Sequence, residues 1–98
     1  MIVSHYVIVT LVVKDQEKLA DYLAVGGPAV TKHDGRAFAG GPQTQVLQQP
    51  HGMTKGVVLE FPSADHVTAW LEDPELADVH ALREAAADVT MLSLPAMG

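Results

Sequence analysis

The segment YVIVTLVV, residues 6–13, constrains the fold most, because it is apolar on both sides of an extended chain. Its β-branched residues predict a strand. Alternation divides that strand into two faces: Val7, Val9, Leu11 and Val13 on one, and Tyr6, Ile8, Thr10 and Val12 on the other. A strand with one solvated face would carry mostly polar residues there. We therefore expect both faces of this strand to be covered.

Capping and breaking residues define a first helical unit. Asp15 is a suitable N-cap for a helix that we expect to end at Gly26-Gly27. Pro28 suits the first position of a second short helical piece that runs towards His33. Asp34-Gly35 then forms a turn.

The second half of the chain predicts a hairpin, another helical unit and a last strand. RAFA, residues 36–39, and KGVVLEF, residues 55–61, are expected to pair, with a continuation of the first over 44–48 as an alternative. Ser63 and Asp73-Pro74 each start a helix. DVTMLSL, residues 88–94, predicts the last strand, and residues 95–98 a tail.

The resulting order, βαββαβ, is the ferredoxin-like α+β pattern with one antiparallel four-stranded sheet. Right-handed crossovers place both helical units on the same face of that sheet. With 98 residues we expect a single domain, 1–98. Helices then cover one of the two apolar faces, and a second copy of the sheet is the simplest cover for the other. We therefore predict a homodimer whose two sheets face each other.

Composition excludes several classes of partner. The net charge is −6 and the six Lys and Arg residues are scattered, which argues against nucleic acid and anionic membranes. There is no cysteine, and the five histidines lack the spacing of metal ligands, so we expect no metal and no cofactor. The apolar run at 6–13 is too short to span a bilayer and lacks signal-peptide flanks, so we expect a cytoplasmic protein.

Three motifs resemble the family catalogued as domain of unknown function 1330 (DUF 1330). They are VVLEFPS (57–63) followed by Ala69-Trp70, Pro28 followed by KHDGR (32–36), and LREAA (82–86). The resemblance covers about residues 6–94 and implies a dimeric α+β barrel, with substrates held between the sheets. It implies no agreed activity. The wider superfamily includes cofactor-free monooxygenases, haem-degrading enzymes and muconolactone isomerases.

Glu60 is the first candidate site residue, because it interrupts an otherwise apolar strand. Leu59 and Phe61 belong on the helix side, so Glu60 should point into the space between the two sheets, beside Tyr6 and Thr10. A partly desolvated carboxylate there would have a raised pKa and could act as an acid or base. The alternative is a pairing with an arginine across the dimer or with trapped water. The family usually has an arginine at the position of Gly40, and this chain lacks it. We therefore expect Glu60 to be incompletely paired.

Four further residues complete the predicted site. Arg36 could hold a substrate carboxylate in fork geometry, or else order a loop or a neighbouring acid. His33 is expected near the pocket mouth as a second proton-transfer group, with a structural role as the alternative. Tyr6 and Thr10 are predicted to contact the ligand.

Several other polar and aromatic residues are interpreted as structural. Arg83 is expected to pair with Glu84, Asp88 or another helix, with a ligand contact as the less favoured alternative. Trp70 and Tyr22 are expected in the core, and His66 and His80 on exposed helical turns.

Three functions remain, in this order. The first is a small homodimeric protein that binds a small organic ligand in a pocket between sheet and helices. The second is a cofactor-free enzyme, monooxygenase- or isomerase-like, acting on a small anionic or aromatic substrate through Glu60 or His33, with Arg36 holding the anion. The third is a haem-handling protein with an axial histidine, which would need a wide apolar pocket.

Overall fold

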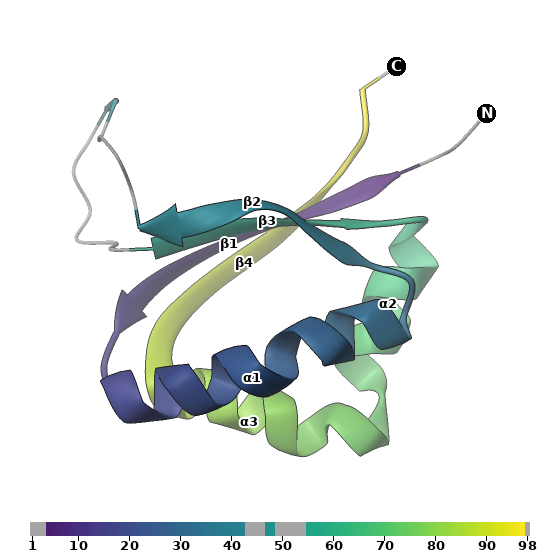
Figure 1. Ribbon diagram of the computed structural model, residues 1–98. Helices are drawn as coiled ribbons and strands as arrows, with labels where there is room; N and C mark the ends of the chain where they lie inside the picture. The colour runs from purple at the N-terminus through teal and green to yellow at the C-terminus, as the bar shows by residue number, and fades with distance from the viewer. Residues whose placement is uncertain (1–3, 43–46, 49–54, 98) are drawn as a thin grey trace.

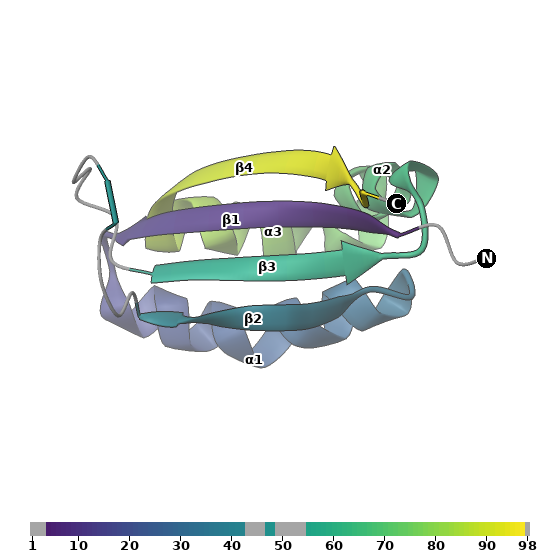
Figure 2. The same cartoon turned by 90° about the horizontal axis from the view of Figure 1, so that it is seen from above.

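The computed structural model describes residues 4–42, 47–48 and 55–97. The elements follow in the order β1 (His5–Val13), α1 (Gln16–Lys32), β2 (Arg36–Pro42), β3 (Lys55–Phe61), α2 (Ala64–Glu72), the 3-10 helix η1 (Pro74–Leu76), α3 (Ala77–Ala86) and β4 (Ala87–Pro95). The described strands form one antiparallel four-stranded sheet in the order β2-β3-β1-β4, with the helices on one face (Figures 1 and 2). The predicted ferredoxin-like fold is confirmed.

The core lies between the sheet and the helices, as the alternation in β1 predicts. Val7, Val9 and Leu11 are buried on the inner face of β1. Phe61 of β3 and Trp70 of α2 are the largest fully buried side chains, and their ring centroids lie 5.3 Å apart. Each such side chain contributes about 1.5–3 kcal/mol by burial, so this layer is the main source of stability.

The predicted break in the first helical unit is wrong. α1 runs unbroken from Gln16 to Lys32 with Pro28 inside it, and His33 is its C-cap. Proline clashes with the side chain of the residue before it when that residue is helical. Gly27 has no side chain, and Gly26 is covered by the ring of Tyr22, so the helix continues through this segment.

Other boundaries follow the sequence closely. β3 has the predicted bounds, and Ser63 and Asp73 are N-caps whose side chains accept backbone N–H bonds from His66 and Glu75. β2 extends to Pro42, and β4 ends at Pro95. The alternative continuation over 44–48 is not borne out at Leu47 and Gln48, which belong to no strand; residues 44–46 lie outside the described part.

None of the described helices lies on the outer face of the sheet (Figure 1). Its β1 side chains, among them Ile8 and Thr10, are half-buried by their neighbours in the sheet. Leu92 and Leu94 of β4 lie opposite Ile8 and Tyr6 and are each 50% exposed. The face is therefore apolar and open. Among the described helices, none has the length and apolar character to cross a membrane.

Candidate functional site

A cavity of about 740 Å³ lies between α1 and the inner face of the sheet. Its lining is mostly apolar and includes Val9, Leu11, Tyr22, Leu23, Val30, Val57, Leu59, Trp70 and Met91. Pockets that hold small molecules have volumes of about 300–1,000 Å³ and similar linings. The cavity is therefore large enough for a small organic ligand.

The cavity exists because small residues of α1 and β2 line it and do not fill the space between these elements. α1 contributes Gly26 and Gly27, and a Cβ atom added to Gly27 would meet nothing within 4 Å. β2 contributes Ala37, Ala39 and Gly40 and is exposed along its whole length. β2 is an edge strand and α1 runs beneath it (Figure 2). The cavity therefore meets solvent between α1 and β2.

Arg83 of α3 is the polar side chain that the sequence analysis did not assign to the site. It is 5% exposed and lines the cavity. The expected ion pair with Glu84 exists, with 3.7 Å between Arg83 Nε and Glu84 Oε1, but that carboxylate is 61% exposed. The spacing could have revealed Arg83, because it lies four residues after Val79 and three before Ala86, on the apolar face of the helix.

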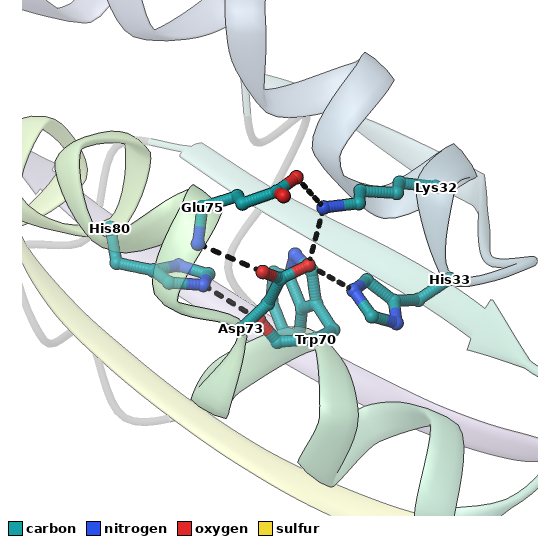
Figure 3. A network of polar contacts seen from close by, with 6 residues as sticks. All are labelled: Lys32, His33, Trp70, Asp73, Glu75 and His80. Carbon is teal, nitrogen blue, oxygen red and sulfur yellow. Dashed lines mark hydrogen bonds and ion pairs between the residues drawn. The ribbon is translucent and has the colours of Figure 1, made fainter.

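His80 is half-buried and holds Arg83 in place, so the expected exposed position is wrong. His80 Nε2 lies 2.9 Å from the carbonyl oxygen of Trp70 (Figure 3). A carbonyl can only accept, so Nε2 carries the hydrogen. His80 Nδ1 then accepts a hydrogen bond from Arg83 Nη1 at 2.8 Å.

Glu60, Tyr6 and Arg36 form a row across three strands on the outer face. The register pairs Tyr6 with Glu60 and Glu60 with Arg36. Arg36 Nε donates to Glu60 Oε1 at 2.7 Å, so the expectation of incomplete pairing is wrong. The pairing of β2 with β3 begins at Arg36, whereas Gly40 lies opposite Val57, which explains the error.

This pairing also sets the ionisation of the row. Arg36 and a hydrogen bond from Tyr6 lower the pKa of Glu60, opposite to the rise expected from desolvation. The Glu60 carboxylate in turn raises the pKa of Tyr6, chiefly by accepting its hydrogen bond. Glu60 is therefore held as a carboxylate and Tyr6 as a neutral phenol.

His33 lies in a separate network at the end of α1. Its Nε2 donates to Asp73 Oδ2 at 2.8 Å, and Lys32 Nζ lies 2.7 Å from the same oxygen and from Glu75 Oε2 (Figure 3). The Lys32 and His33 bonds hold the pKa of Asp73 far below its usual range. The network joins α1 to η1, and the His33 ring points to Asp73 (Figure 3).

The predicted site residues therefore lie in different places. Thr10 borders a shallow hollow on the outer face with Ile8 and Val58. Arg36 reaches the edge of the main cavity. Their predicted roles in catalysis or binding, and those of Glu60, His33 and Tyr6, stay predictions.

Ser63 contacts His66, and His66 contacts Asp34, as in a serine-histidine-acid triad. The geometry of these contacts is nevertheless that of a helix cap. Ser63 Oγ lies 2.7 Å from His66 Nδ1 and also accepts the backbone N–H of His66 at 3.3 Å. His66 Nε2 is 3.7 Å from an Asp34 carboxylate that is largely exposed. Across the described residues, no three His, Cys, Asp or Glu side chains form a metal-binding group.

Fold and cavity together define a class: a small ferredoxin-like α+β protein with a cavity of ligand size between its sheet and helices. A family model described as "Domain of unknown function (DUF1330)" matches residues 4–97. The chain belongs to this family. Comparison with curated proteins gives no match.

Solved structures share the fold at low sequence identity. The hydroxynitrile lyase from Passiflora edulis is similar with a TM-score of 0.79 and 15% identity, over 96% of this chain and 94% of that one. A dimeric ferredoxin-like protein of unknown function from Jannaschia sp. CCS1 gives 0.73 and 14%, over 93% and 97%. SnoaB, a cofactor-independent oxygenase from Streptomyces nogalater, gives 0.65 and 9%, over 98% and 93%. At such identities the likeness shows the shared fold alone.

Proposed function

We propose that this chain is a small homodimeric protein that binds a small organic ligand in the cavity between α1 and the sheet. The observation that carries the proposal is the cavity itself: about 740 Å³, apolar, reached from solvent, and containing the buried Arg83. A space of this size with an apolar wall and few polar groups is typical of small-molecule sites.

The homodimer is proposed through the outer face of the sheet. Leu92 and Leu94 are half exposed there, and the helices that the structure describes all lie on the other face. The Jannaschia protein of the same fold is described as dimeric, which supports the same assembly here. The Tyr6–Glu60–Arg36 row and Thr10 would then lie at the interface, where a second protomer could complete a polar site.

Native mass spectrometry of protein purified from its own host tests both parts. We expect a dimer of about 21 kDa, twice the 10.4 kDa chain, that carries an additional small mass released on denaturation. A bare monomer would contradict the proposal.

The second candidate function is a cofactor-free enzyme in which Glu60 or His33 transfers a proton and Arg36 holds an anionic substrate. The position of Arg36 favours it, because this guanidinium is largely exposed and reaches the edge of the cavity, where it could hold a substrate anion. The lyase and the oxygenase of the same fold support the idea that such chemistry suits this architecture. If any turnover is found, Glu60→Gln or His33→Gln should abolish it, and full activity in both variants would exclude this role.

A further inference from the structure

Arg83 carries a buried positive charge that its 3.7 Å ion pair with the largely exposed Glu84 neutralises only in part. Its side chain is 5% exposed. His80 accepts a hydrogen bond from Arg83 Nη1 through Nδ1 and donates its Nε2 hydrogen to the Trp70 carbonyl, so it supplies an acceptor but no negative charge. Glu84 is the acid that lies near Arg83, at 3.7 Å, beyond hydrogen-bond distance and largely in solvent. A buried charge without a close counter-ion is costly.

Two buried donors at this place also lack acceptors. Within the described part of the chain, neither Arg83 Nε nor Trp70 Nε1 has a hydrogen-bond partner. Trp70 is 2% exposed and lines the same cavity as Arg83, with the guanidinium carbon 5.6 Å from the indole ring. A buried donor with no acceptor destabilises the fold, so two in one cavity need an explanation.

We infer that the cavity binds an organic acid, whose carboxylate accepts hydrogen bonds from Arg83 Nε and Trp70 Nε1 and whose apolar body fills the space beneath α1. The inference rests on the proposed function and names the class of its ligand. A carboxylate suits the site because it supplies both missing acceptors and, at once, a negative charge closer to the guanidinium than that of Glu84. Val9, Val30, Leu59 and Met91 provide an apolar wall for the rest of the molecule.

Arg83 fits this role better than the other cations that border the cavity. Arg36 already donates to Glu60 at 2.7 Å, and its side chain is 62% exposed. Lys55 is the first residue of β3 and is only half-buried, whereas Arg83 is buried. Screening by water weakens a charge at the rim, whereas a charge inside the cavity acts at low effective dielectric.

Isothermal titration calorimetry with octanoate and octanamide tests the inference. The two probes share an apolar chain, but octanamide has no charge. We expect the wild type to bind octanoate at least about tenfold more tightly than octanamide. Arg83→Met should remove this preference and Arg83→Lys should keep part of it. Trp70→Phe should weaken octanoate binding about three- to tenfold.

Lys18→Met is the matched control, because it removes one positive charge from the exposed surface of α1 and should leave both affinities unchanged. Thermal melts establish that each variant is folded. If Arg83→Met does not fold, the preference of the wild type for octanoate and the affinities of Arg83→Lys still test the inference. Equal affinities for the two probes would overturn the organic-acid inference and leave the cavity as a ligand site. Binding of neither probe would overturn the inference, and an empty cavity in protein from the native host would overturn the proposed function as well.

Discussion

Arg83 shows at the scale of one residue how stability and ligand binding can oppose each other. Replacing it with Met removes a buried charge and keeps a side chain of similar length. Because the arginine lacks a close counter-ion, we expect Arg83→Met to be stabilising or neutral, within about 1 kcal/mol of the wild type. Urea unfolding at one fixed protein concentration measures the change. A loss of about 3 kcal/mol or more would show instead that Arg83 is a well-paired structural residue.

Asp73 should contribute to the acid sensitivity of the fold. Its pKa is lowered in the folded state by Lys32 and His33, so its contribution to stability is complete above the unfolded value of about 4. That contribution is lost as the pH falls through the folded pKa. Asp73→Asn retains a good N-cap but not the charge. We expect it to melt at a lower temperature than the wild type at pH 7 and to lose less on acidification.

Thermal melts from about pH 7 to pH 2 compare the two proteins. Because the pKa of Glu60 is also lowered, the variant should still lose some stability in acid. Identical pH profiles for the wild type and Asp73→Asn would contradict the role given to this network.

Individual contacts were harder to predict from sequence than the faces of the strands. Alternation correctly placed Glu60 beside Tyr6 on the outer face, but the pairing of Glu60 with Arg36 depends on the register of β2. A β-bulge between Ala37 and Ala39 shifts that register, and no local sequence pattern predicts the bulge. Arg83 is different, since its helical spacing already put it on the apolar face.

Replacing Pro28 tests whether α1 is one continuous helix. Inside a helix, proline removes the hydrogen bond to the carbonyl four residues earlier, here that of Ala24, and its ring clashes with the same group. Pro28→Ala restores the donor, so we expect it to raise the free energy of unfolding by about 1–3 kcal/mol. Pro74→Ala is the matched control, because Pro74 is at the first position of η1 and needs no donor. A Pro28→Ala variant no more stable than Pro74→Ala would contradict the continuous helix.

Most elements could be predicted because their signals are local. The alternation of β1, the caps at Ser63 and Asp73, and the apolar run of β3 each act within a few residues. The join at Gly26-Gly27-Pro28 is decided by tertiary contact, because α1 packs along α3. The Tyr22 ring, one turn earlier in the same helix, also covers Gly26. Local propensity therefore favoured a break that packing does not allow.

For the whole molecule we expect a dimer that forms through the outer face of the sheet. Ile8 lies at the centre of the outer face, opposite Val58 and Leu92. Ile8→Lys would force an unpaired charge between two sheets, so we expect the dimer dissociation constant to rise at least about a hundredfold. Ala20→Lys, on an exposed position of α1, carries the same charge and should leave the dimer intact.

Sedimentation velocity at micromolar concentration measures both variants. The wild type and Ala20→Lys should sediment near 21 kDa, twice the mass of the chain. Unchanged dimerisation of Ile8→Lys would place the interface elsewhere on the molecule.

Trp70 reports directly on ligand binding in the cavity, because it is the only tryptophan in the chain. Its indole N–H gives a single side-chain resonance in a ¹H–¹⁵N NMR spectrum. We expect octanoate to move this resonance in a saturable manner, because the buried Nε1–H gains an acceptor, and we expect Arg83→Met to lose most of the shift. If the indole resonance of the folded protein stays in place at saturating octanoate, no carboxylate binds in the cavity at Trp70.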